Sequence, residues 1–171
     1  PGLERIRLGS LEPDMMTDED IARLASVKKF CPQFHLSLQS GCSETLRRMR
    51  RPYTAQQYAA VVDKLRAAFG NQCSFTTDII VGFAGETPEE FAQSLAFVEQ
   101  IGFLKVHVFP YSRREGTPGW SMPNQVDEQT KSQRTKEMQQ TADRVRASIC
   151  TKMQGTQEEV LLEKPLSGTL F

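Results

Sequence analysis

The chain has 171 residues, in which 21 lysines and arginines are balanced by 21 aspartates and glutamates. This length suits one domain with a buried core, and the zero net charge gives no sign of a broad nucleic-acid-binding surface. We expect no membrane association, because no apolar run approaches the length of a membrane span. Four scattered cysteines predict free thiols in a reducing compartment and argue against a metal site made by this chain.

Strand-like and helix-like segments alternate in the first half of the chain. Residues 5–8 and 35–39 alternate apolar and polar side chains, as half-buried strands do. The sequence Thr-Asp-Glu-Asp at 17–20 predicts the capped start of one helix. The capping box at 54–57 predicts a second helix, which extends to about Phe69 with apolar residues on one face.

The most informative segment of the chain follows this helix. Residues 75–81 form an apolar, β-branched run that predicts a buried strand. Gly82 and Gly85 remove side chains where the chain must turn, and Thr87 with Glu90 forms the capping box of the next helix. In parallel α/β folds a ligand commonly binds where a strand leads through a glycine turn into a helix. A well-formed turn without a ligand is the alternative.

The second half of the chain continues the same alternation. The helix that begins near Thr87 keeps apolar residues at helical spacing up to Ile101, and residues 105–109 predict a further strand. A long polar helix is expected over about 127–153. Strands that alternate with helices at this spacing predict βαβ units and a parallel sheet.

The predicted strands have one polar face, whereas a parallel sheet covered by helices on both faces would be apolar on both. The residues on this face are Arg5, Arg7, His35, Ser37, Gln39, Thr76, Asp78, Lys105 and His107. We therefore predict an α/β fold in which outer helices surround about four parallel strands of a partial (βα) barrel with a polar, ligand-binding interior. An open sheet with one wet face is the alternative. Four units are too few to close a barrel, so we expect a fragment that self-associates through its unpaired strand edges.

Five sequence segments together resemble the methylthiotransferase family of radical S-adenosylmethionine enzymes. They are Arg-Leu-Gly-Ser-Leu-Glu-Pro at 7–13, His-Leu-Ser-Leu-Gln-Ser-Gly-Cys at 35–42, Leu46 with Met49, Arg51 and Tyr53, the strand–turn–helix segment at 77–90, and Phe-Pro-Tyr-Ser-Arg-Arg-Glu-Gly-Thr-Pro at 109–118. The first two blocks are most similar to the branch that acts on threonylcarbamoyladenosine in tRNA. Ala84 stands where the family usually has proline, and Ser43 where it usually has aspartate.

The resemblance implies that residues 1–155 are the C-terminal part of a radical SAM barrel. Residues 156–171 would be a linker or the start of a truncated TRAM-like β domain. The full-length parent would be a cytoplasmic enzyme that binds S-adenosylmethionine and two 4Fe-4S clusters and methylthiolates N6-threonylcarbamoyladenosine next to the anticodon of tRNA. Because the chain has no C-x-x-x-C-x-x-C motif, we expect it to be inactive alone and to bind neither cofactor.

The same resemblance assigns roles to single residues. The expected cofactor-binding residues are Ser37, Gln39, Ser40, Gly41, Arg51, Ile80, Gly82, Phe83, Gly85, Phe109 and Tyr111. Among these, Arg51 would pair with the cofactor carboxylate, since a guanidinium suits such a contact. Arg113 and Arg114, beside the expected pocket mouth, would contact the substrate. No catalytic residue and no metal ligand is predicted in this chain.

Several alternatives stay open from the sequence. The parent could be another radical SAM enzyme, such as a ribosomal-protein methylthiotransferase or a coproporphyrinogen oxidase relative, or the chain could be a non-catalytic α/β binding module. His107 could relay a proton or simply be hydrogen-bonded. Glu12 could face the pocket or cap the loop before Pro13.

Overall fold

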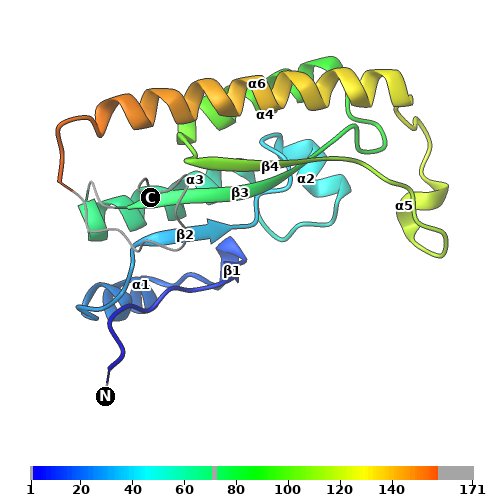
Figure 1. Cartoon of the computed structure of the whole chain (residues 1–171). Helices are drawn as coiled ribbons and strands as arrows, with labels where there is room; N and C mark the ends of the chain where they lie inside the picture. The colour runs from blue at the N-terminus through cyan, green and yellow to red at the C-terminus, as the bar shows by residue number, and fades with distance from the viewer. Residues whose placement is uncertain (1, 71–72, 158–171) are drawn as a thin grey trace.

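In the computed structural model, which describes residues 2–70 and 73–157, the chain folds around one parallel sheet. The four strands lie in the order of the sequence (Figure 1), and are β1 Ser10–Leu11, β2 Gln33–Leu36, β3 Ser74–Val81 and β4 Lys105–Pro110. The helices are the 3-10 turn η1 Pro13–Met15, α1 Asp18–Ala25, α2 Ser43–Arg48, α3 Ala55–Phe69, α4 Pro88–Ile101, α5 Pro118–Ser121 and α6 Glu128–Lys152. The predicted α/β class and the four parallel strands are confirmed.

Three of the helices begin at the predicted capping residues. Thr17, Thr54 and Thr87 each accept a hydrogen bond from the backbone N–H three residues later, and the side chain at that later position bonds back to the threonine N–H. These reciprocal bonds satisfy donors that the first turn of a helix cannot pair internally. Helix α4 ends at Gly102, whose φ of 71° is a left-handed conformation that glycine adopts without strain.

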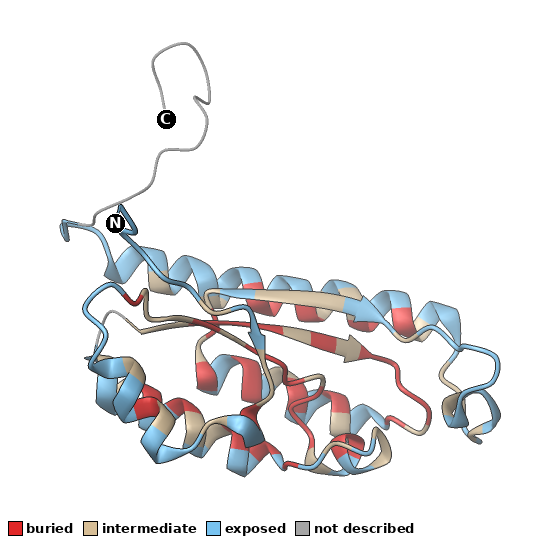
Figure 2. Ribbon diagram, turned by 90° about the horizontal axis from the view of Figure 1, so that it is seen from below, coloured by how far each residue is buried: buried red, intermediate tan, exposed pale blue. Residues whose placement is uncertain are grey.

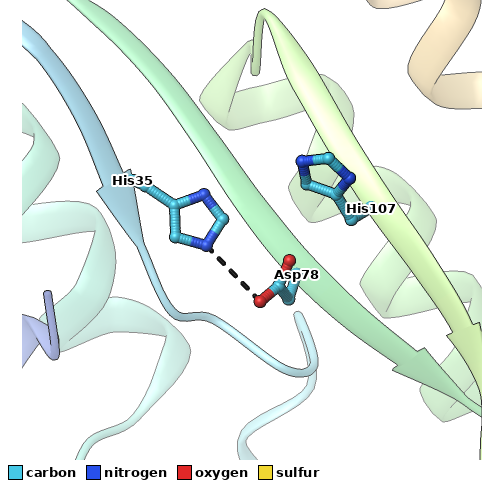
Figure 3. A group of neighbouring side chains, drawn as sticks. All are labelled: His35, Asp78 and His107. Atoms are coloured by element: carbon cyan, nitrogen blue, oxygen red, sulfur yellow. Dashed lines mark hydrogen bonds and ion pairs between the residues drawn. The ribbon is translucent and has the colours of Figure 1, made fainter. Parts of the chain in front are cut away.

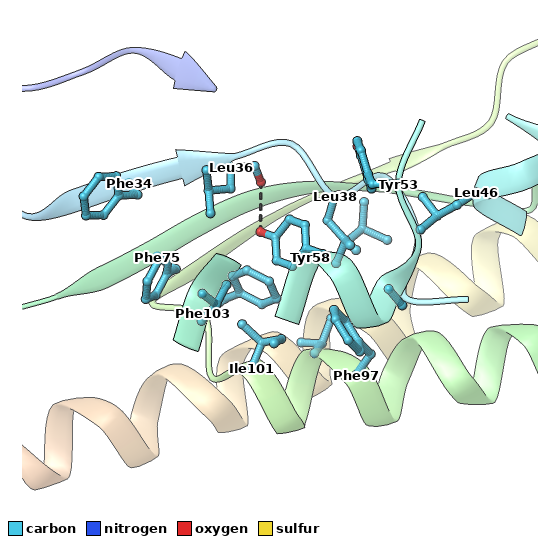
Figure 4. Close-up of a cluster of buried hydrophobic side chains, with 14 of the residues drawn as sticks. Phe34, Leu36, Leu38, Leu46, Tyr53, Tyr58, Phe75, Phe97, Ile101 and Phe103 are labelled. Carbon is cyan, nitrogen blue, oxygen red and sulfur yellow. Dashed lines mark hydrogen bonds between the residues drawn. The ribbon is translucent and has the colours of Figure 1, made fainter. Parts of the chain in front are cut away.

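The core lies between the sheet and helices α3 and α4. Tyr58 of α3 is fully buried, and its hydroxyl donates a hydrogen bond of 3.1 Å to the carbonyl of Leu36 (Figure 4). Phe34 and Phe75, on neighbouring strands, are also buried, with ring centroids 5.9 Å apart. Met138 places α6 in the same core. Burial of these side chains provides most of the free energy that holds the helices on the sheet.

The opposite face of the sheet is polar and more exposed. His35 Nδ1 lies 2.9 Å from the hydroxyl of Thr76 on the neighbouring strand. Figure 2 shows that β4 is only partly buried along its length, in contrast to the largely buried β3. The predicted division into one apolar and one polar face is therefore present in the folded sheet.

The structure corrects the first two strands. The strand predicted at 5–8 is wrong, because this segment makes only one bridge, between Ile6 and Phe30, and the paired strand is at Ser10–Leu11. The second strand ends at Leu36, not at Gln39. Gln39 makes a separate bridge to Ile79 with a left-handed φ of 70°, because the chain turns before rejoining the sheet.

The domain boundary predicted near residue 155 stays a prediction. Helix α6 ends at Lys152, and most of the segment predicted as a linker or TRAM-like start, 158–171, lies outside the described residues. Among the described residues, no helix combines the length and apolar character needed to cross a membrane.

Candidate functional site

A cavity of about 760 Å³ lies at the carboxyl ends of the strands, where parallel α/β sheets usually bind ligands. Its lining residues are Gln39, Arg48, Met49, Arg50, Arg51, Asp78, Ile80, Phe83, Phe109, Pro110, Tyr111, Ser112, Arg114, Thr117, Pro118, Gly119 and Met122. We call this cavity the strand-end pocket. It is built from the ends of β3 and β4, from the segments that follow β2, β3 and β4, and from the end of α2 with the loop after it, so only the fold brings them together.

The strand-end pocket divides the predicted site residues into two groups. Those that line it are Gln39, Arg51, Ile80, Phe83, Phe109, Tyr111 and Arg114. Those that lie outside its lining are Ser37, Ser40, Gly41, Gly82, Gly85 and Arg113. The roles of both groups stay predictions. In the second group, the Ser37 carbonyl accepts a hydrogen bond of 2.7 Å from the Tyr53 hydroxyl, and the Gly85 N–H donates to the Asn124 carbonyl at 2.8 Å.

Gln39 is held at the pocket edge by its backbone. Its N–H donates to the carbonyl of Asp78 at 2.9 Å, and its own carbonyl accepts from the N–H of Ile80 at 2.9 Å. The left-handed φ of 70° is unfavourable for a residue with a side chain. The two hydrogen bonds to β3 hold this conformation and fix the Gln39 backbone against the strand that lines the pocket.

Ser40 and Gly41 face helix α4, away from the pocket. The Ser40 hydroxyl lies 3.1 Å from the Ser94 hydroxyl, which also accepts from the N–H of Gly41 at 3.2 Å. A Cβ atom at Gly41 would lie 2.6 Å from Cβ of Phe97 and 2.8 Å from Cα of Ser94. Close packing of the helix therefore accounts for the glycine at this position.

The glycine turn after β3 is held by helix α6. The Gly82 N–H donates to the Glu86 carboxylate at 2.7 Å, and Arg134 of α6 donates to the same oxygen at 2.7 Å. Burial raises the pKa of Glu86, and these two partners oppose that rise. A Cβ at Gly82 would lie 2.5 Å from Cγ of Lys131. The sequence places these glycines where the chain must turn, and at Gly82 the group that packs against the backbone is Lys131 of α6.

Aromatic and apolar side chains form one wall of the pocket. Phe83 and Tyr111 meet edge to face, with ring centroids 4.8 Å apart at 65°. Ile80 lines the cavity beside them, and Phe109 is 51% exposed, which is unusual for a phenylalanine. Such a wall suits a flat heteroaromatic ring, because rings gain dispersion and quadrupole interactions from stacking or edge contacts.

One of the arginines that line the strand-end pocket, Arg51, already has a carboxylate partner. Arg51 donates to the two carboxylate oxygens of Glu12 at 3.0 and 3.1 Å. The Tyr53 hydroxyl also approaches this carboxylate, and burial raises the pKa of Tyr53. Glu12 makes no capping hydrogen bond to η1, so it engages Arg51 and does not cap the loop. A ligand carboxylate would have to share or displace Glu12 to reach Arg51.

The two arginines predicted to contact the substrate differ in position. Arg113 lies over the Trp120 ring, 4.6 Å from its centroid, and donates to the Trp120 carbonyl. Arg114 lines the pocket. Only Arg114 is placed to contact a bound molecule there.

The cysteines do not fit an iron–sulfur cluster. Cys42 is buried at the start of α2, and Cys150 is exposed near the end of α6. Burial raises the pKa of the half-buried Cys73 thiol to about 11, which disfavours the thiolate that a cluster requires.

A family model described as the radical SAM superfamily matches residues 2–98, more than half of the chain. The chain belongs to this superfamily. The predicted likeness to the methylthiotransferases is confirmed by two relatives that are each 40% identical. One is a threonylcarbamoyladenosine tRNA methylthiotransferase of Chlamydia pneumoniae, aligned over 96% of this chain and 39% of its own length. The other is a tRNA-2-methylthio-N(6)-dimethylallyladenosine synthase of Thermobifida fusca, aligned over 94% and 32%.

The radical SAM chain therefore spans well under half the length of these relatives. Solved structures agree on the fold. Coproporphyrinogen III oxidase from Escherichia coli aligns with a TM-score of 0.67 at 19% identity, over 82% of this chain and 32% of its own. Methylornithine synthase aligns with a TM-score of 0.58 at 14% identity, over 81% and 39%. At these identities the likeness shows a shared fold, that of the radical SAM barrel enzymes.

Sequence reasoning missed several pocket residues of this radical SAM chain. Asp78 was placed on the polar face but not at the pocket, and Met49 and Met122 were not considered as lining residues. Residues 117–119 also line the cavity. The position of this segment near the pocket could have been predicted, because the sequence block at 109–118 runs past the end of a predicted strand.

Proposed function

We propose that this chain is the second half of the barrel of a radical SAM tRNA methylthiotransferase, and that its strand-end pocket holds S-adenosylmethionine in the complete enzyme. One observation carries the proposal. Residues that the family resemblance selects from four separate segments of the sequence converge on a single cavity of about 760 Å³. A volume of this size is typical of small-molecule and cofactor sites.

The residues present fit the organic cofactor. The wall of Ile80, Phe83 and Tyr111 would hold the adenine, and Arg51 would hold the carboxylate in exchange for Glu12. Gln39 would present its amide to the polar part of the molecule. In the complete enzyme the cofactor would supply the radical chemistry of hydrogen abstraction. The chain positions the cofactor and shields it from water.

The residues present do not fit an iron–sulfur cluster, so we derive no step through one. The four cysteines form no C-x-x-x-C-x-x-C motif. We expect the purified chain to be colourless and iron-free, to lack activity alone, and to bind S-adenosylmethionine too weakly for calorimetric detection.

The substrate we propose is N6-threonylcarbamoyladenosine next to the anticodon of tRNA. The support is the sequence of the blocks at 7–13 and 35–41 together with the Chlamydia relative. Relatives named for the dimethylallyl substrate are as similar, and that substrate is the competing outcome. A tRNA substrate would place the complete enzyme in the cytoplasm.

A chimera tests the proposal. The chain would replace the aligned segment of the Chlamydia relative, and the chimera would be expressed in a bacterial strain that lacks its own enzyme for this modification. We expect mass spectrometry of the tRNA to detect 2-methylthio-N6-threonylcarbamoyladenosine. The chain expressed alone should give none.

Two variants of the chimera locate the site. Arg51→Met should reduce the modification strongly, because it removes the proposed carboxylate partner while keeping a long side chain. Arg113→Met, which changes an arginine that is held by Trp120 and lies outside the pocket lining, is the matched control and should keep most of the modification. A stable, cluster-loaded chimera that modifies no tRNA would contradict the proposed function.

Self-association remains part of the proposal. Strands β1 and β4 are the sheet edges among the described residues, and an unpaired edge can pair with another chain. Light scattering of the purified chain at increasing concentration should show a mass above 19.3 kDa; a constant monomer mass would disprove this part.

A further inference from the structure

Two histidines and one aspartate meet on the polar face of the sheet. His35 lies on β2, Asp78 on β3 and His107 on β4, and Figure 3 shows their side chains pointing toward one another. One ligand atom from each residue lies within 4.8 Å of the other two. We call these residues the His–Asp–His cluster. Asp78 also lines the strand-end pocket, so the cluster adjoins that cavity.

The parallel register of the strands creates the cluster. Asp78 is paired with His107, and His35 is paired with Thr76, two residues before Asp78. Residues two apart in a strand lie on the same face, so all three side chains project from one side of the sheet. They are 43 and 29 positions apart in the sequence, which explains why no local spacing pattern revealed them.

The donor set and its geometry suit a divalent transition-metal ion. Two imidazoles with one carboxylate are ligands that zinc and non-haem iron sites use, with further positions left open. Ligand atoms around a tetrahedral zinc ion lie about 3.4 Å apart, given bonds of about 2.1 Å. His35 Nε2 and Asp78 Oδ2 already lie 3.4 Å apart. The His107 ligand atom lies within 4.8 Å of both, so a bound ion would have to draw it closer.

The surroundings favour this use of the histidine nitrogens. His35 Nδ1 lies 2.9 Å from the Thr76 hydroxyl, and a proton held on Nδ1 by this contact leaves the Nε2 lone pair free for a metal. Metal-binding histidines typically have such a partner on the other ring nitrogen. Across residues 2–70 and 73–157, the His107 ring contacts the His35 ring at 6.1 Å but makes no hydrogen bond, so its nitrogens are available.

We propose that the His–Asp–His cluster binds one divalent transition-metal ion. This inference does not depend on the proposed function, since it rests on three side chains of the chain alone. The protein ligands would occupy three positions, and water or a ligand in the adjoining pocket would take the rest.

Zinc binding to the purified full chain tests the proposal. The protein has only two histidines, so NMR of ¹⁵N-histidine-labelled chain reports on both rings without interference. We expect a single equivalent of Zn²⁺ to shift the ring nitrogen signals of both His35 and His107. Calorimetry should give one site per chain.

Matched variants identify the ligands. Asp78→Asn and His107→Gln keep size and polarity and should each weaken zinc binding about tenfold or more. Asp63→Asn, which changes an exposed carboxylate on α3, should leave it unchanged. Thr76→Val leaves all three ligands in place and should weaken binding less than they do, and it serves as the test if a ligand variant fails to fold.

Two outcomes would overturn the proposal. In the first, zinc binds with unchanged affinity in both ligand variants. In the second, the histidine signals do not move on zinc addition, while Co²⁺ in place of zinc gives a thiolate charge-transfer band. That band would assign the metal to cysteines.

Discussion

The two faces of the sheet differ in burial and in the polarity of their side chains. On the face toward α3 and α4, Phe34, Leu36 and Phe75 are almost completely buried against other apolar side chains. On the opposite face, His35, Asp78 and His107 remain partly exposed, and each has a ligand atom within 4.8 Å of the other two. On the buried face, the volume and shape of each side chain matter most, because interiors are packed closely. On the polar face, the functional groups of the side chains matter most, so substitutions there should alter binding more than folding.

The largest expected effect is on the buried face. Phe75→Ala removes a ring that stacks on Phe34 and lies under the Arg66 guanidinium. We expect it to lower the free energy of unfolding by about 3–5 kcal/mol, through lost burial and the cavity left behind. Urea unfolding followed by circular dichroism measures this loss. A cost below about 1 kcal/mol would mean that the two faces do not differ as described.

The second-largest effect is expected at Gly41, where the chain packs against helix α4. Gly41→Ala places a methyl group against the Phe97 side chain and the backbone of α4. Because backbone atoms cannot rotate away, we expect a cost of about 1–3 kcal/mol. Gly9→Ala is the matched control, since no atom lies within 4 Å of its added Cβ. Equal unfolding midpoints for the two variants would contradict the packing argument.

A third prediction concerns the rim where α2 meets α4. Burial raises the pKa of Glu90, but hydrogen bonds from Arg48 and from the Thr87 N–H outweigh burial and lower the pKa below its ordinary 4.5. The lowered pKa means that Glu90 stabilises the fold above pH 4.5 and loses this contribution as the pH falls through its folded-state pKa. Glu90→Gln should cost about 2 kcal/mol at pH 7.

Measuring the free energy of unfolding at pH 7 and at pH 3 tests the direction of this pH dependence. Glu90→Gln should lose less stability on acidification than the parent chain, because it has no carboxylate to protonate there. Glu44→Gln is the control, since its ion pair with Arg47 is exposed and contributes little. Parallel acid dependences for all three proteins would disprove the role of Glu90.

The smallest expected effect is on the polar face. His107→Gln should change the free energy of unfolding by about 0.5 kcal/mol or less, as is usual for substitutions away from the core. The ring is partly exposed and makes no hydrogen bond within the described part of the chain. Its unfolding curve should overlay that of the parent chain, while zinc titration separates the two proteins. A loss of several kcal/mol would show that side chains on the polar face also contribute strongly to the stability of the fold.

The sequence predicted helices better than strands. Thr17, Thr54 and Thr87 each mark a helix start, because a capping box is a local pattern of four residues. The first strand was placed at 5–8 instead of Ser10–Leu11, because alternation shows that a segment can pair but not which residues find a partner. Which residues pair depends on the register with β2, and that register cannot be read from the sequence of the segment alone.

The candidate site was predicted in part, for a similar reason. Gln39, Arg51 and Phe83 lie in motifs and were found from them. The ion pair of Arg51 with Glu12, the contact of Gly41 with α4 and the His–Asp–His cluster join residues far apart in the chain. Such contacts follow from packing and strand register, so reading motifs one at a time could not reveal them.

The hold of α6 on the glycine turn has a mechanical consequence. Arg134 and Lys131 join the turn at Gly82 to a helix of 25 residues, which is about 37 Å long. We therefore expect the helix and the turn to move together. A displacement of the far end of α6 would then shift the turn, and a molecule that shifts the turn would displace that end.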